Sequence, residues 1–278
     1  MRYRAAVVIA IALLAAQHAS AAPPASPVKA TLLADVSAFK PGDPFTLGVL
    51  LEIEPEWHVY WTNPGDSGFA PTVKFTLPPG FSATPLAFPI PTRFNQPDNA
   101  VGYGYHDRVL LTARVTTPKD LPAGRNVEIG AAVSWLCCKD ACIPGKAKTT
   151  LALNLSDGPL AANSELFKTW VAMIPVPLDR SQDIAKVDSA LDPKNHTATL
   201  TVHWKHVPAE VQLFPGADDA IAVKEITPKT AGQTTTITMN VQTLPGQTPA
   251  AAELPAVIAF TDANGHRKGV EVKVPLKS

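Results

Sequence analysis

The chain has 278 residues, and its 24 lysines and arginines balance its 24 aspartates and glutamates, which leaves a formal net charge of zero. This balance argues against a protein that binds nucleic acid through a basic surface. The length exceeds a typical domain of about 100 to 200 residues, and 28 prolines spread along the chain disfavour long helices. We therefore expect two β-rich domains.

The amino terminus has the pattern of a secretory signal. Arg2 and Arg4 supply positive charge, residues 5–16 carry none, and Ala19-Ser20-Ala21 is a small-x-small cleavage pattern. The uncharged run is shorter than the about 20 residues that span a membrane. We expect residues 1–21 to be removed, giving a periplasmic protein that does not itself span the membrane, in a compartment that permits disulfides.

Short segments of β-branched and apolar residues, separated by turn residues, follow the signal. Spacing of this kind is typical of a β-sandwich, which we expect over residues 22–156. The segments are residues 29–36, 44–53, 108–115, 126–136 and 147–155.

The pattern then changes, and residues 157–180 are predicted to form a short helical linker. Leu166, Trp170 and Met173 have helical spacing, Asn163 or Ser164 can cap the first turn, and a proline-rich stretch ends it.

Strand patterns resume after the linker, and two of them alternate strictly between apolar and polar residues, so each should have one buried face. We expect a second sandwich over residues 181–278, which makes the fold all-β. His203 and His206 are three residues apart and would face opposite sides of a strand, so no metal site is predicted there. The expected strands are residues 184–191, 197–205, 210–215, 234–242, 255–262 and 269–276.

All three cysteines, Cys137, Cys138 and Cys142, lie in one short stretch, WLCCKDACIPG. A bond between any two of them closes a very small loop and removes little entropy from the unfolded chain, so structural stapling explains them poorly. Residues 133–138 continue a strand and residues 139–141 can turn. Cysteines that flank a hairpin turn can meet the Cα separation of about 4.4 to 6.8 Å that a disulfide needs.

Adjacent strand residues face opposite sides, so Cys137 and Cys138 cannot both meet Cys142. A bond between the two neighbours would need a distorted peptide. We take Cys138–Cys142 as the pair and Cys137 as a buried, small apolar residue. A Cys137–Cys142 bond is the alternative, and it would mean that the hairpin register is shifted by one residue.

The cysteine segment, residues 135–153, resembles the cysteine hairpin of the amino-terminal periplasmic domain of the thiol:disulfide interchange protein DsbD, and more closely that of its relative ScsB, the suppressor of copper sensitivity. The family pattern is an aromatic residue, two residues, Cys, three residues, Cys, a hydrophobic residue and Pro-Gly, which residues 135–145 fill. Residues 56–81 resemble the segment WHxYWxNPGDSG, and residues 96–111 resemble the loop and strand that cap the cysteines. Cys137 departs from the family, which more often has an aliphatic residue there.

The resemblance implies two immunoglobulin-like sandwiches. The sequence departs from full-length relatives by ending at Ser278, so we expect a stand-alone form of the family's amino-terminal region. The resemblance also implies that Cys138 and Cys142 are the catalytic pair and that Cys142 exchanges with the partner. The implied partners are a membrane-embedded thiol:disulfide carrier and periplasmic thioredoxin-like or disulfide isomerase proteins. No cofactor is expected, because the chain offers no nucleotide-binding glycine motif, flavin site or Cys-x-x-Cys.

A cap over the sulfurs is implied by the same resemblance. This cap corresponds to residues 98–105, whose glycines allow hinge conformations and whose tyrosines can cover a sulfur pair. His58 and Tyr60 alternate with two core tryptophans, so these two residues are expected to border the cysteines, and Cys137, directly before Cys138, is a further candidate for the surroundings of the pair. The expected cap loop comprises Asp98, Asn99, Val101, Gly102, Tyr103, Gly104 and Tyr105.

Three function classes follow from these residues. The favoured one is a protein-disulfide reductase component that passes electrons by dithiol/disulfide exchange. The second is copper(I) handling, because three cysteines with His58 or His106 nearby suit a soft metal ion. The third is a non-redox β-sandwich interaction module with vestigial cysteines.

Overall fold

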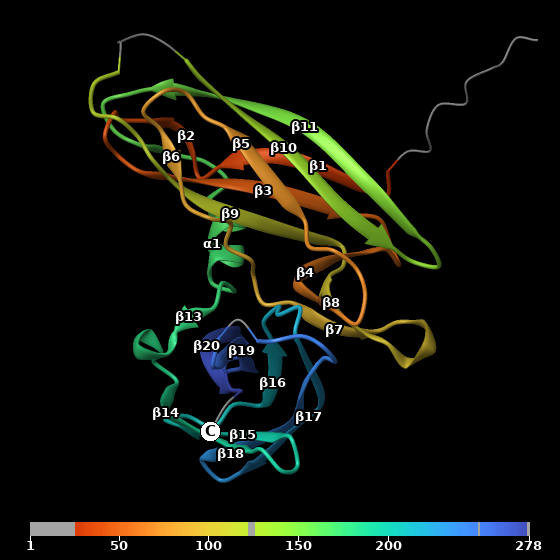
Figure 1. Ribbon diagram of the computed structural model, residues 1–278. Coiled ribbons are helices and arrows are strands. Elements are labelled where there is room, and N and C mark those ends of the chain that lie inside the picture. Colours follow the sequence, from red (N-terminus) through yellow and green to blue (C-terminus); the bar gives the residue numbers. More distant parts are fainter. Residues whose placement is uncertain (1–25, 122–125, 250, 277–278) are drawn as a thin grey trace, which may run out of the picture.

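The structure, a computed structural model, describes residues 26–121, 126–249 and 251–276. The predicted signal, residues 1–21, lies outside this part. The chain folds into two β-sandwiches, drawn one above the other in Figure 1, and the all-β prediction is confirmed. None of the helices in the described part is long and apolar enough to cross a membrane.

The first sandwich packs two sheets face to face. One sheet has the order β1 (Val28–Ala34), β3 (Phe45–Ile53), β9 (Arg108–Thr116) and β6 (Ser82–Ala83). The other has the order β12 (Leu160–Ala161), β2 (Val36–Phe39), β11 (Cys142–Leu155), β10 (Val127–Cys138), β4 (His58–Gly65), β8 (Val101–Tyr105) and β7 (Thr92–Asn95), with β5 (Thr72–Thr76) also paired to β10.

Strand alternation decides which side chains form the core. Along β10 every second side chain from Val127 to Trp135 is buried, and the residues between them face outward. The buried set packs against Leu47, Val49 and Leu51 of β3, which are fully buried. The long β10–β11 hairpin therefore has one face in the core and one face in solvent (Figure 1).

The predicted linker contains a helix, α1 (Ser164–Val171), followed by a short 3₁₀ turn, η2 (Leu178–Arg180). Asn163 precedes α1, as expected of a cap, but its side-chain amide donates to the carbonyl of Ala34, 2.9 Å away, instead of capping the helix. Phe167 of α1 is buried and packs closely over Gly48. The helix is thus part of the first sandwich's packing, and the limits of the linker stay a prediction.

The second sandwich has two four-stranded sheets. One has the order β13 (Val176–Pro177), β20 (Arg267–Pro275), β19 (Glu253–Thr261) and β16 (Glu210–Pro215), and the other β14 (Ile184–Asp192), β15 (Thr197–Trp204), β18 (Thr234–Thr243) and β17 (Ile221–Ala231). The alternating burial predicted for β15 is confirmed. Strand β17 was not predicted, because Pro228 and its charged residues interrupt the apolar pattern.

The two sandwiches meet along β4 and β8. The ring of Phe214, from the second sandwich, lies with its centroid 6.1 Å from that of Trp61 and 5.4 Å from that of Tyr103. The Arg267 guanidinium donates to the carbonyl oxygen of Pro91 at 2.6 Å. The second sandwich therefore packs against β8 and against β4, the strand that pairs with the cysteine-bearing end of β10.

Candidate functional site

A disulfide closes the tip of the β10–β11 hairpin. Cys138 and Cys142 lie opposite each other in the strand register, with their Cα atoms 4.1 Å apart, and their sulfurs are bonded. The chain turns between them, where the Lys139 amide donates to the carbonyl of Ala141. The predicted pairing is therefore confirmed, and the alternative with Cys137 is wrong because the register is not shifted.

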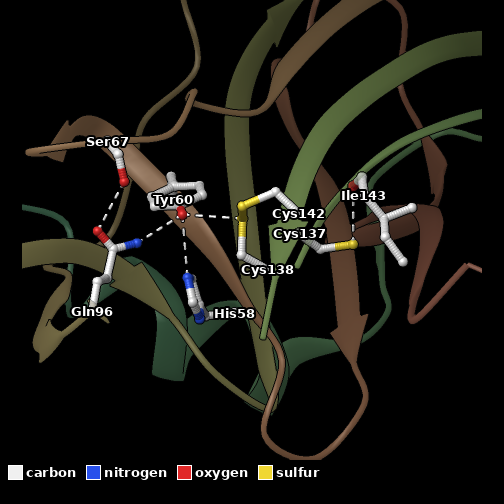
Figure 2. Close-up of a disulfide and its surroundings, with 8 residues drawn as sticks. All are labelled: His58, Tyr60, Ser67, Gln96, Cys137, Cys138, Cys142 and Ile143. Carbon is white, nitrogen blue, oxygen red and sulfur yellow. Dashed lines mark hydrogen bonds between the residues drawn. A yellow bond between two sulfur atoms is a disulfide. The ribbon is translucent and has the colours of Figure 1, made fainter. Parts of the chain in front are cut away.

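Cys137 faces away from the disulfide, as Figure 2 shows. Its side chain is fully buried, and its thiol donates to the carbonyl oxygen of Ile143 at 3.3 Å. Burial raises the pKa of this thiol, because the apolar surroundings disfavour a thiolate. Cys137 is thus a protonated core residue in the resting protein, which confirms the prediction that it is a buried apolar residue, and it faces away from the pair because adjacent strand residues point to opposite faces.

The two bonded cysteines differ in access to solvent. Cys138 is only 3% exposed, whereas Cys142 is exposed at the start of β11. A thiolate approaching from solvent therefore has better access to Cys142 than to Cys138.

A chain of hydrogen bonds runs from the surface to the buried sulfur (Figure 2). The Tyr60 hydroxyl donates to Cys138 Sγ at 3.1 Å. Gln96 Nε2 donates to the Tyr60 oxygen at 2.8 Å, and Ser67 Oγ donates to Gln96 Oε1 at 3.0 Å. The phenol is thus oriented by the amide, and its single proton points at the sulfur.

His58 completes the polar surroundings, and the expectation that it and Tyr60 border the cysteines is met in position. The register places His58 directly across from Cys138, and its Nε2 lies 3.3 Å from the Tyr60 hydroxyl. Because that hydroxyl already donates to sulfur, the histidine nitrogen is the donor in this contact. Burial and the neighbouring His106 lower the pKa of His58 to about 4, so the ring is neutral at neutral pH.

The tyrosines of the expected cap loop do not lie over the sulfurs. Tyr105 pairs with Val59 and Tyr103 is two residues away, so both rings are on the core face of the sheet. The Tyr105 hydroxyl donates to the carbonyl of Pro89, and Tyr103 packs on Phe214. The sequence interpretation is corrected here: alternation along β8 turns the tyrosines away from Cys138.

The glycines of the same segment face the disulfide side. A Cβ atom at Gly102 would lie 2.3 Å from Phe94 Cε2, and one at Gly104 would lie 2.0 Å from the carbonyl oxygen of Val59. These positions therefore need glycine so that β7 and β4 can approach closely. The other cap positions lie in the turn η1 (Pro97–Asn99), which holds Asp98 and Asn99, and at Val101, whose amide donates to Asp66.

Phe94 is the aromatic residue that the sequence interpretation missed. It is half-buried, and its ring centroid lies 4.3 Å from that of His58 and 6.3 Å from that of Tyr60. Gly68 makes room for Tyr60 in the same way, since a Cβ atom there would lie 2.4 Å from Tyr60 Cε1. The signal that could have pointed to Phe94 was Gly102, the glycine that lies directly across from it in the strand register.

Comparison with known proteins supports the fold and the hairpin. The family model of the thiol:disulfide interchange protein DsbD, amino-terminal domain, matches residues 27–154. The structure is similar to the amino-terminal periplasmic domain of ScsB from Proteus mirabilis, with 17% identity, a TM-score of 0.64, and coverage of 88% of this chain and 91% of that one. No curated protein sequence matches the chain.

Two further solved structures show only weak likeness. The YadV chaperone has 13% identity and a TM-score of 0.25, with 87% of this chain and 98% of that chain covered. The pilin subunit BcpA of Bacillus cereus has 11% identity and a TM-score of 0.27, with 90% and 66% covered.

Proposed function

Because residues 27–154 belong to the family of DsbD amino-terminal domains, we propose that this protein passes electrons by dithiol/disulfide exchange between a membrane thiol carrier and periplasmic partners. The observation that carries the proposal is the asymmetric disulfide at the hairpin tip. Cys142 is exposed, while Cys138 is buried and accepts a hydrogen bond from Tyr60. In this arrangement the partner exchanges with the sulfur of Cys142, and the sulfur of Cys138 is the leaving group within the hairpin.

Reduction of the disulfide proceeds in two exchange steps. A partner thiolate attacks Cys142 Sγ, the Cys138–Cys142 bond breaks, and its electron pair goes to Cys138 Sγ as a thiolate, which Tyr60 stabilises by hydrogen bonding. The partner's second thiolate then attacks the partner's first sulfur, which is bonded to Cys142 in the mixed disulfide, and the two partner sulfurs become bonded. Cys142 leaves as a thiolate, both cysteines take up protons, and the partner is left oxidised. The reverse sequence reduces the next protein.

The copper(I) alternative loses part of its support in this geometry. It rested on three sulfurs within six residues, but the thiol of Cys137 points into the core and donates to Ile143. Only two sulfurs, with His58 and His106 nearby, share the face of the sheet that bears the disulfide. Within the described residues, no group of three or more His, Cys, Asp and Glu side chains is arranged to hold a metal ion.

Export to the periplasm is part of the proposal. The matched ScsB structure is of a periplasmic domain, and the signal predicted at residues 1–21 would deliver this chain there. An oxidising compartment is also where a disulfide at an exposed hairpin persists.

Trapping of a mixed disulfide tests the proposal. In Cys137→Ser/Cys138→Ser protein, Cys142 has no cysteine left to resolve the bond that it forms with a partner. We expect covalent complexes with membrane and periplasmic proteins that dissolve on reduction. The control is Cys137→Ser/Cys142→Ser, whose remaining sulfur is buried and should capture little. If Cys142 is alkylated readily but captures nothing, the exchange function is wrong.

A further inference from the structure

The face of the hairpin that bears the disulfide continues as a lysine-bordered surface. Outward positions on β10 and β11 alternate with core positions. Counting away from the disulfide, the next two outward positions are Leu136 and Ser134 on β10, and Pro144 and Lys146 on β11. The next row contains Lys74 of β5, Ala132 and Lys148, which lie side by side across three strands. Disulfide and lysines are therefore on one side of one sheet.

This surface is hollowed and positively charged. Small residues on β10, Ala132 and Ser134, lie between the longer side chains of Lys74, Lys146 and Lys148, and the hollow between them has a volume of about 430 Å³. All three lysines are exposed, and none has an ion-pair partner within the part of the chain that the structure describes.

Carboxylates are missing from the same rows. The outward positions of β5 are Thr72, Lys74 and Thr76, and those of β11 from its start to Thr150 carry no acid. At the tip itself, outside these rows, Lys139 is paired with Glu56, and the exposed Asp140 lies in the turn beside it. Although the formal charges of the chain sum to zero, the three unpaired lysines in adjacent rows form a local patch of positive charge.

The distances place Lys146 inside the edge, and the row of Lys74 and Lys148 just outside the edge, of a partner of standard size that docks centred on the cysteines. With a rise of about 3.3 Å per residue, Lys146 lies about 13 Å and Lys148 about 20 Å from Cys142 along β11. An interface of standard size covers about 800 Å² on each partner, which is a disc of about 16 Å radius. Charges at this radius remain hydrated, so they affect the rate of association more than the final affinity.

We propose that Lys74, Lys146 and Lys148 form a docking surface for partners that carry acidic side chains beside their reactive thiol. The inference rests on the proposed exchange function and adds the chemistry of the partner. The lysines attract the acidic surface, and the partner's thiol is then presented to the exposed sulfur of Cys142.

Thiol peptides of defined charge test this docking surface. The full chain with Cys137→Ser/Cys138→Ser is converted at Cys142 to a mixed disulfide with 2-nitro-5-thiobenzoate, whose displacement by a thiol is read from its absorbance. One peptide has a cysteine with glutamates about four and six residues away, which matches the spacing of the lysines at about 3.3 Å per residue. The other peptide has glutamines at those positions.

At about 0.01 M salt, where the Debye length is about 30 Å, we expect the acidic peptide to react about tenfold faster than the neutral one. The ratio should fall to about one at 1 M salt, where the Debye length is about 3 Å. Adding Lys74→Gln/Lys146→Gln/Lys148→Gln should abolish the preference at low salt. The matched control, Lys194→Gln/Lys224→Gln/Lys229→Gln, removes the same charge from exposed sites on the second sandwich and should keep it.

The two hypotheses fail in different ways. A ratio that is the same with and without the three lysines overturns the docking surface, while the proposed function stands if the neutral peptide and dithiothreitol still release the chromophore. No release by any thiol instead contradicts exchange at Cys142. A third outcome is that the acidic and neutral peptides react at equal rates, while phosphatidylglycerol vesicles bind the parent protein and not the triple variant. This outcome would assign the lysines to a lipid surface and also overturn the inference.

Discussion

The hydroxyl of Tyr60 donates a hydrogen bond to the sulfur of Cys138 across 3.1 Å and links strand β4 to the disulfide. The sulfur becomes a thiolate when the bond is reduced, and a hydrogen bond to an ion is stronger than one to a neutral acceptor. Tyr60 therefore stabilises the reduced state more than the oxidised state.

Tyr60→Phe should lower the reduction potential of the pair. A hydrogen bond to a charged group contributes about 1.5 to 3 kcal/mol, and about 1.4 kcal/mol corresponds to 30 mV for two electrons. We expect a decrease of roughly 30 to 60 mV, measured by equilibration with glutathione. Phenylalanine keeps the ring packed against Gly68, so the fold should persist. An unchanged or higher potential would show that the phenol does not stabilise the thiolate.

His58 should make the stability of the fold depend on pH. Its pKa is lowered from 6.5 to about 4 by burial and by His106, so between these values the unfolded chain binds a proton that the folded chain does not. The free energy of unfolding is therefore unaffected by this group above pH 6.5 and falls as the pH decreases from 6.5 to about 4. The full loss corresponds to roughly 3 kcal/mol.

Urea unfolding at several pH values measures this effect. His58→Gln should have a smaller slope of stability against pH in that window, because glutamine does not titrate. Below pH 4 the lowered pKa of carboxyls such as Asp262, at about 2, adds a separate loss in both proteins. Equal slopes for the two proteins between pH 6.5 and 4 would contradict the neutral state of His58.

Local patterns in the sequence were sufficient to predict the hairpin and to narrow the disulfide to two candidates. Strand alternation allows only one of Cys137 and Cys138 to meet Cys142, the spacing of the resembling family favoured Cys138, and the observed register has Cys138 opposite Cys142. The same reasoning placed His58 and Tyr60 on the face opposite the core tryptophan Trp61, where the structure has them.

Contacts between distant segments were beyond that reasoning. Tyr60 and Cys138 are 78 residues apart, and the register of β4 against β10 depends on how the whole sheet assembles. For β8, alternation predicts that tyrosines and glycines face opposite sides, but not which side bears the disulfide. The choice of the tyrosines as the cover was therefore wrong.

Phe94 should protect the buried sulfur. In the reduced Cys137→Ser/Cys142→Ser background only Cys138 can react with iodoacetamide. We expect Phe94→Ala to increase its alkylation rate roughly tenfold, since the ring packs on His58 directly opposite that cysteine. Gly102→Ala should act in the same direction, because its new methyl group would displace the Phe94 ring.

Tyr103→Ala is the control for this cover. Its ring lies on the core face against Phe214, so its removal should leave the alkylation rate of Cys138 nearly unchanged. Acceleration by Tyr103→Ala without any effect of Phe94→Ala would restore the tyrosines as the cover.

Phe214 should connect the second sandwich to the strands of the site. Its ring is buried between Trp61 of β4 and Tyr103 of β8, and truncating a buried phenylalanine costs about 3 to 5 kcal/mol. We expect Phe214→Ala to lower the free energy of unfolding by this amount. Because the cavity would open beneath β4, amide hydrogen exchange should also become faster in residues 58–65 and 101–105.

Phe260→Ala separates this effect from general destabilisation. Phe260 is equally buried but packs on Trp204 inside the second sandwich, away from β4 and β8. It should destabilise the protein comparably and accelerate exchange in β15 and β19 instead. If Phe214→Ala leaves exchange in residues 58–65 as slow as in the unmodified protein, the second sandwich does not support the disulfide site, because β4 would then keep its position without that ring.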